Sequence, residues 1–264
     1  MCTCGCGPTE HHDHAHQPAH DHGAHGHGHE HFHRHEGGNS HHHHDEATGR
    51  TIAIEIDILA KNDHLAAGNR AFFQEKGIFV LNLVSSPGSG KTAILERTLR
   101  DLKEKISFAV IEGDQQTDND AVRISATGAP VHQVNTGAGC HLDAHMVCHA
   151  MDHFHMDAVD ILMIENVGNL VCPASFDLGE HHKVVVLSVT EGEDKPLKYP
   201  TMFHNSDVML LNKIDLLPHV DFDAEKCKAS ARRINPGILI FEVSIKTGEG
   251  MDAWYEWLAA ACRK

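Results

Sequence analysis

A glycine-rich stretch between an apolar run and a helix-like pattern constrains this chain more than any other feature. It reads Ser85-Ser86-Pro87-Gly88-Ser89-Gly90-Lys91-Thr92. Strand, glycine-rich loop, Gly-Lys-Thr and helix follow one another in a phosphate-binding P-loop. Glycines let backbone N–H groups turn toward phosphate oxygens, and the start of the following helix favours negative charge. Lys91 can reach the β- and γ-phosphates, and the Thr92 hydroxyl can bind Mg²⁺. The candidate nucleotide-binding residues here are Gly88, Ser89, Gly90, Lys91 and Thr92.

Apolar runs after the P-loop alternate with longer polar segments, which indicates a parallel sheet with helices on both faces. The predicted strands cover residues 78–84, 107–111, 131–134, 159–164, 183–189, 207–211 and 238–243. We therefore predict an α/β fold, the three-layer sandwich of P-loop NTPases with a mostly parallel central sheet. Residues 51–264 form this domain and begin with an amphipathic docking helix over residues 51–76. The alternation of Ile52, Ile54 and Ile56 allows a short strand before that helix.

Residues 1–50 differ in composition, because they hold 16 of the 27 histidines and almost no aliphatic residues. Such a segment buries too little apolar area to offset its ordering entropy, so we predict a disordered metal-binding tail. Cys2, Cys4 and Cys6 place three thiols at its start. Thiolates and neutral imidazoles bind Ni²⁺, Zn²⁺ and copper ions. Metal storage or buffering is the favoured reading, and an engineered purification tag at His41–His44 is the alternative.

The formal charge of −15 argues against nucleic acid or an anionic membrane as the main partner. The chain has no signal-peptide pattern and no apolar run near 18 residues, from which we expect a cytoplasmic protein. In that compartment the eight cysteines are better interpreted as thiols or metal ligands than as disulfides.

Acidic residues follow two of the predicted strands, at the edge where α/β folds bind ligands. Asp114 ends the sequence Glu-Gly-Asp, and Glu165 begins Glu-Asn-Val-Gly. Either carboxylate can approach the Mg²⁺ of a bound nucleotide, although Asp114 could instead cap a turn. We predict Lys91, Asp114 and Glu165 as catalytic residues, and Thr92, Asp114 and Glu165 as the magnesium site. A water could be positioned by Gln115, Gln116, Asp118 or Asp120, among which the sequence does not choose.

A guanine-recognition signature follows the sixth predicted strand, as Asn212-Lys213-Ile214-Asp215. The Asp215 carboxylate can accept two hydrogen bonds from guanine, whereas adenine lacks that pair of donors. The Lys213 stem can cover the base. After the last strand, Ser244, Ile245 and Lys246 match the short loop that supports the base in GTPases.

Two cysteine loops leave the same edge of the sheet. One contains Cys140 and His141, and the other contains Cys172. Thiolate and imidazole together suit Zn²⁺ or Ni²⁺. The two loops could meet each other, or could meet their copies in a second subunit.

In this order the motifs resemble those of the hydrogenase nickel-incorporation GTPases, the HypB accessory proteins. The resemblance covers nearly all of residues 51–264. It implies a GTPase of the signal-recognition-particle and MinD type, which binds GTP or GDP with Mg²⁺, turns over slowly and forms a nucleotide-dependent homodimer. It also implies a nickel or zinc site at the subunit interface, made by Cys140, His141 and Cys172. Cys2, Cys4 and Cys6 resemble the family's nickel motif, Cys-x-x-Cys-Gly-Cys, with one spacer residue fewer.

The function implied by the resemblance is nickel delivery during maturation of [NiFe]-hydrogenase. The implied partners are the accessory metallochaperone HypA and the precursor of the hydrogenase large subunit. Two alternatives remain: a nickel GTPase of urease assembly, and a nickel storage or buffer protein whose GTPase activity is secondary.

Overall fold

The computed structural model describes residues 44–115 and 118–262. The chain divides into two units, Met1–Ile54 and Glu55–Lys264, and the second contains the whole sheet. The predictions for the tail up to residue 43, including Cys2, Cys4 and Cys6, lie outside the described residues. In the part of the chain that the structure describes, no helix is long and apolar enough to cross a membrane.

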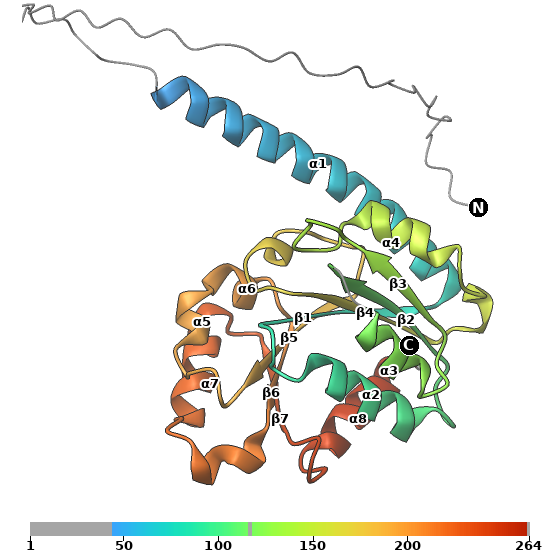
Figure 1. The fold of residues 1–264 in the computed structure, drawn as a ribbon, viewed down its shortest axis with the longest axis vertical. Helices are drawn as coiled ribbons and strands as arrows, with labels where there is room; N and C mark the ends of the chain where they lie inside the picture. The colour runs from blue at the N-terminus through green and yellow to red at the C-terminus, as the bar shows by residue number, and fades with distance from the viewer. Residues whose placement is uncertain (1–43, 116–117, 263–264) are drawn as a thin grey trace, which may run out of the picture. The chain divides into compact units, whose positions relative to one another are not determined.

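A seven-stranded sheet forms the centre of the second unit, with the order β3-β2-β4-β1-β5-β6-β7 (Figure 1). Every pairing in it is parallel, which confirms the predicted fold class. The strands are β1 Phe79–Ser85, β2 Phe108–Asp114, β3 Val131–Asn135, β4 Ile161–Gly168, β5 His182–Ser188, β6 Val208–Asn212 and β7 Leu239–Val243. The strand that enters the P-loop, β1, lies between β4 and β5. All strands end at one edge of the sheet, so the predicted site residues gather there.

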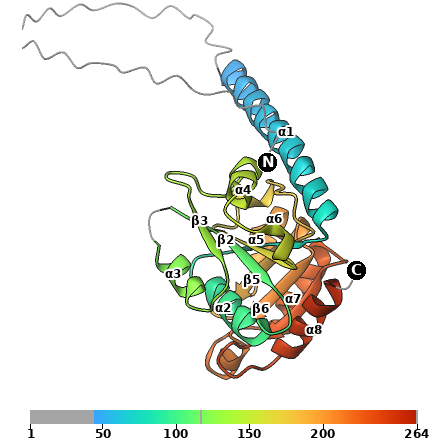
Figure 2. The ribbon, with the colours of Figure 1, turned by 90° about the vertical axis from the view of Figure 1, so that its right-hand side faces the viewer.

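Helices cover both faces of the sheet and make three layers (Figure 2). On one face Val184 and Val186 of β5 share a core with α2 Lys91–Leu102 and α8 Met251–Ala261. On the other face Val185 and Leu187 pack with α6 Pro200–His204 and α7 Ala224–Ile234. Burial on both sides explains why central strands such as β1, β5 and β6 are largely apolar. The remaining elements are α3 Asn119–Ser125, α4 Ala144–Met151, α5 Lys195–Lys198 and the 3₁₀ turns η1 Met156–Ala158, η2 Cys172–Ala174 and η3 Ile214–His219.

Helix α1 spans His44–Lys76, so it begins before residue 51. The short strand allowed at Ile52, Ile54 and Ile56 is wrong, because all three lie within this helix. No proline interrupts residues 44–76, and each further helical residue adds a hydrogen bond without a new nucleation step. Within the second unit, Ala66 and Phe73 of α1 are completely buried. The docking face therefore lies in the second half of the helix.

Candidate functional site

The P-loop connects β1 to α2 and is held by the guanine-signature segment. Gly90 caps α2 with φ +95°, and a Cβ at this position would lie 2.4 Å from Asn212 Nδ2. Asn212 Nδ2 donates to the Ser89 carbonyl at 2.9 Å, and Lys213 Nζ donates to the Gly88 carbonyl at 2.7 Å. Only glycine permits both this backbone conformation and this close approach. The predicted phosphate-binding and base-binding segments are thus in direct contact.

The two P-loop side chains with predicted phosphate and magnesium roles converge on Glu165. Lys91 Nζ and Thr92 Oγ1 each lie 2.6 Å from Glu165 Oε1. Lys91 is 9% exposed and Glu165 is completely buried, so their ion pair is shielded from solvent. A buried carboxylate needs such partners, because an unpaired charge in the interior is very unfavourable. The lysine, the hydroxyl and the acid are therefore held at one point of the pocket.

A second buried acid, Glu112, lies opposite Glu165 in the register of β2 and β4. It is 2% exposed, and burial together with the Glu165 charge raises its pKa to about 8. Within the described residues, Glu112 Oε2 and Glu165 Oε2 have no hydrogen-bond partner. Carboxylate oxygens are the ligands that Mg²⁺ prefers, so the residues present fit that ion. Asp114, which the sequence predicted, lines the same pocket. Glu112, two residues earlier on the same side of the strand, also lines it but was not predicted.

The pocket around these groups has a volume of about 470 Å³. Besides the P-loop and the strand ends, Asp120 and Arg123 of α3 line it. Asp120 Oδ2 accepts from Thr92 Oγ1 at 3.1 Å, and Arg123 contacts Asp120 Oδ1 at 2.8 Å. The sequence placed Asp120 among four candidates and did not single out Arg123, because a charged side chain on a surface helix carries no distinguishing pattern.

The predicted base-recognition residues come together beside the P-loop. Asp215 lies in η3, and its Oδ1 accepts a hydrogen bond from Ser244 Oγ at 2.7 Å. Ser244 is completely buried, whereas Lys246 is exposed in the loop that follows. The Ile245 carbonyl accepts from Arg97 at 3.0 Å, which ties this loop to α2. The hydroxyl of Ser244 therefore orients the carboxylate that we expect to read the base.

A cluster of soft metal ligands lies on two loops of this single chain. The ligand atoms of Cys140, His141 and Cys172 all lie within 4.8 Å of one another. Two ligands bound to one Zn²⁺ at about 2.0–2.3 Å can be at most about 4.6 Å apart, so a small contraction would suffice. The contact with Cys172 raises the pKa of the Cys140 thiol, and burial lowers the pKa of His141. A neutral imidazole is the form that binds metal.

Short contacts join the nucleotide pocket to the loop that carries Cys140 and His141. Gln115, next to Asp114, donates to the Gly139 carbonyl at 3.1 Å. The Leu142 N–H donates to Asn166 Oδ1 at 3.0 Å, one residue beyond Glu165. Helix α4 begins only at Ala144, where the Asp143 side chain caps it by accepting from the Met146 N–H. Leu142 therefore precedes the helix, and its N–H reaches Asn166.

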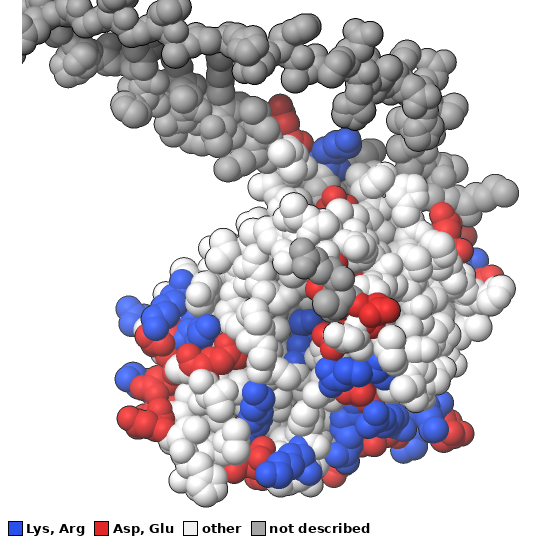
Figure 3. All heavy atoms as spheres, in the orientation of Figure 1, with Lys and Arg blue, Asp and Glu red and all other residues white. Residues whose placement is uncertain are grey.

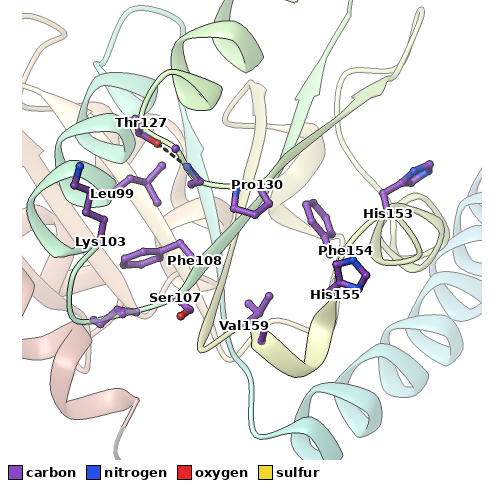
Figure 4. A pocket seen from close by; sticks show the side chains of 14 residues that line it. Leu99, Lys103, Ser107, Phe108, Thr127, Pro130, His153, Phe154, His155 and Val159 are labelled. Carbon is purple, nitrogen blue, oxygen red and sulfur yellow. Dashed lines mark hydrogen bonds between the residues drawn. The ribbon is translucent and has the colours of Figure 1, made fainter.

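A second cavity, of about 540 Å³, opens at the opposite edge of the sheet (Figure 4). It is bordered by residues that precede β2 and β4, including Ser107 and Val159. Its floor is largely apolar, with Phe108, Pro130 and Phe154 turned toward the same space. It lacks the converging acids and the P-loop of the smaller pocket. We therefore assign the nucleotide chemistry to the 470 Å³ pocket.

Charged side chains of both signs are intermixed over α2, α5 and α7 on the face shown in Figure 3. Ion pairs such as Arg97–Asp101 and Lys226–Glu193 account for this mixture.

The family model of the CobW/HypB/UreG nucleotide-binding domain matches residues 79–242 of this chain. The hydrogenase maturation factor HypB of Rhizobium leguminosarum bv. viciae is 61% identical over 215 residues, which cover 81% of this chain and 72% of that protein. Among solved structures, HypB from Helicobacter pylori in complex with nickel has 42% identity and a TM-score of 0.74, covering 77% of this chain and 95% of that chain. The hydrogenase maturation factor HypB from Archaeoglobus fulgidus has 41% identity and a TM-score of 0.72, covering 77% and 99%. The P-loop, the buried acids and the cysteine loops thus occur in a chain that belongs to the HypB family of hydrogenase maturation factors.

Proposed function

We propose that this chain is a cytoplasmic GTPase that delivers nickel, or regulates its insertion, during [NiFe]-hydrogenase maturation. The observation that carries the proposal is the direct contact between the two sites. Gln115 and Asn166 of the nucleotide pocket hydrogen-bond Gly139 and Leu142, on either side of Cys140 and His141. A nucleotide-dependent shift of the strand ends would therefore reach the metal ligands within one residue.

Guanine selectivity rests on Asp215, whose carboxylate would accept from guanine N1–H and the exocyclic amine. The Ser244 hydrogen bond holds that carboxylate in place. In Asp215→Asn an amide replaces the carboxylate and places a donor opposite a donor of guanine. This change should shift the nucleotide preference from GTP to xanthosine triphosphate. We expect the original chain to hydrolyse GTP but not ATP. Equal rates with both nucleotides would contradict the assignment.

Hydrolysis would use the residues that converge on Glu165. A bound triphosphate would compete with that carboxylate for Lys91, which would then neutralise charge on the β- and γ-phosphates. Thr92, Asp114 and Glu165 would hold Mg²⁺, an ion that screens the phosphate oxygens when bound. Among the described side chains that line the pocket, Arg123 is the only arginine, and it is paired with Asp120 and Glu96. Slow turnover is the expected result.

Nickel is the proposed cargo of the Cys140, His141 and Cys172 site, and Zn²⁺ is the competing occupant. Three protein ligands leave a coordination position for a second subunit or an acceptor protein. We accordingly propose a GTP-dependent homodimer, with HypA and the precursor of the hydrogenase large subunit as partners. The histidine-rich segment that precedes the domain would store nickel.

The test of this function is nickel affinity measured with GDP and with a non-hydrolysable GTP analogue. We expect the two affinities to differ by at least about 5-fold, the usual lower range of coupling between sites. Equal affinities would remove nucleotide control of nickel from the proposal.

Deletion of residues 8–45 separates delivery from storage. If hydrogenase maturation survives at low nickel while the bound nickel per chain collapses, delivery belongs to the domain and storage to the tail. If the deletion abolishes hydrogenase maturation as well as the bound nickel per chain, the chain is better explained as a storage or buffer protein. Activation of urease but not of hydrogenase would favour the urease-type alternative.

A further inference from the structure

Four buried polar side chains form a continuous chain beneath the nucleotide pocket. They are Asn166, Asn82, Glu180 and Lys183, which are 1%, 0%, 9% and 6% exposed. They come from β4, β1, the loop before β5, and β5 itself. Polar groups at such depth are unfavourable unless each is hydrogen-bonded. Their connections therefore show what the fold gains from burying them.

The upper half of the chain begins at the nucleotide pocket. Asn166 lines that pocket, and its Oδ1 accepts from the N–H groups of Leu142 and Val167, both at 3.0 Å. Its Nδ2 donates to Asn82 Oδ1 at 3.2 Å, and Asn82 Nδ2 donates to Glu180 Oε1 at 3.0 Å. Asn82 thus uses both ends of its amide to link Asn166 with Glu180.

The lower half of the chain ends on the loop that carries Cys172. Glu180 Oε2 accepts from the Leu178 N–H at 2.6 Å, and Lys183 Nζ lies 3.9 Å from Glu180 Oε1. The Lys183 ammonium also donates to the carbonyls of Pro173, Ala174 and Phe176, at 2.9, 3.1 and 3.1 Å. Those carbonyls begin directly after Cys172, so one cation fixes the path of the chain there.

The two ends of the network therefore hold the two halves of the metal site. Asn166 holds Leu142, the residue after His141, and Lys183 holds the turn after Cys172. Asn166 also follows Glu165, the acid that contacts Lys91 and Thr92 of the P-loop. A displacement of Glu165 would move Asn166, and the buried hydrogen bonds from Asn166 to Glu180, followed by the Glu180–Lys183 ion pair, would pass that displacement on, because disrupting any of these buried contacts is unfavourable.

We propose that Asn166, Asn82, Glu180 and Lys183 are the coupling element through which the bound nucleotide sets the geometry of the Cys140, His141 and Cys172 site. The inference rests on the proposed function, because it takes a guanine nucleotide and a divalent metal as the two ligands. The four residues are positioning residues, which contact neither ligand's reacting atoms. The link between Asn82 and Asn166 is the point where the network is interrupted without touching either metal loop.

Two variants break that one link from opposite sides. Asn82→Leu removes the amide within the apolar β1 and leaves the contacts of Asn166 with Leu142, and of Lys183 with the Cys172 turn, in place. Asn166→Asp keeps the acceptor for Leu142 but loses the donor to Asn82. The matched control is Asn235→Ala, which removes an amide that donates to the Ser206 carbonyl at 2.9 Å, remote from both sites.

The measurement is Ni²⁺ affinity of the full chain with GDP and with a non-hydrolysable GTP analogue. Every variant also carries serine in place of Cys2, Cys4 and Cys6. The thiolate-to-nickel absorption then reports only nickel bound by the other thiols of the chain. Chelator competition gives both affinities, and their ratio is the coupling factor. Nucleotide affinity and thermal unfolding are measured alongside, because a merely structural defect would lower these without changing the ratio.

We expect a ratio of at least about 5 in the parent chain and in Asn235→Ala, and a ratio at least about 2-fold lower in both link variants, in which only the direct contacts at Gly139 and Leu142 still join the two sites. If both variants bind nickel and nucleotide and retain the parent ratio, the coupling element is wrong while the proposed function stands. If the parent ratio is itself one, nucleotide control is refuted, and the coupling element with it.

Discussion

The buried acid Glu112 makes the nucleotide-free protein less stable than a neutral variant, and Glu112→Gln measures by how much. Glutamine has the shape of glutamic acid but cannot ionise. The folded-state pKa of Glu112 is about 8, against an ordinary value of 4.5, because burial and the Glu165 charge oppose its ionisation. The unfolded chain therefore loses this proton at a lower pH than the folded chain. Wild-type stability should fall, relative to Glu112→Gln, as the pH rises from 4.5 to 8.

The size of the effect follows from linkage between the two pKa values. The advantage of Glu112→Gln should be about 1 kcal/mol at pH 5, about 3 kcal/mol at pH 7 and about 5 kcal/mol at pH 9. These are upper values, because the glutamine amide that replaces the Glu112 carboxyl group must also find hydrogen bonds in the pocket. The rise with pH is the more specific part of the prediction, because it requires the difference between the folded and unfolded pKa values of Glu112.

Urea unfolding of nucleotide-free, magnesium-free protein at the three pH values gives the free energies. Glu104→Gln, which changes an exposed carboxylate, serves as the control and should leave stability within about 0.5 kcal/mol of wild type. The reasoning is refuted if the difference between Glu112→Gln and wild type stays constant from pH 5 to pH 9, or if it decreases.

Three further predictions concern single positions. Gly90→Ala should abolish nucleotide binding measured by fluorescence titration, because its φ is +95° and the added methyl group would overlap Asn212; binding within 3-fold of wild type would contradict this. Cys172→Ser should lower nickel affinity by at least about 10-fold in chelator competition, because loss of a ligand costs at least as much as loss of a group that orients one; Cys262→Ser, away from the cluster, should not change it. Phe73→Ala should lower the free energy of unfolding by about 3–5 kcal/mol, because this ring is completely buried; a loss below 1 kcal/mol would show that α1 does not dock as described.

The sequence predicted all seven strands because most of them are largely apolar runs, with β3, which contains His132 and Gln133, as the exception. It predicted the P-loop because the motif contains its own geometry. Gly88 and Gly90 have positive φ values, and both glycines are visible in the sequence. The base-binding signature and the Cys140–His141 pair were recognisable for the same reason, since their residue types and local spacing carry the chemistry.

The start of α1 was not predictable in this way. Three alternating isoleucines satisfy a strand pattern as well as a helix pattern over so short a window. A strand there would need a sheet edge to pair with, and partners of that kind are a property of the whole fold.

Tertiary structure alone decided which acids and amides share a site. Glu112 and Glu165 are 53 positions apart, and only the parallel register of β2 with β4 sets them side by side. Asn82 and Lys183 are polar residues within apolar strands, and the fold shows that Asn82 links Asn166 to Glu180 while Lys183 holds the Cys172 turn. Local pattern determines which chemistry a residue can perform, because that depends on its own atoms and close neighbours. Which groups meet depends on contacts between distant segments, and these exist only once the sheet has formed.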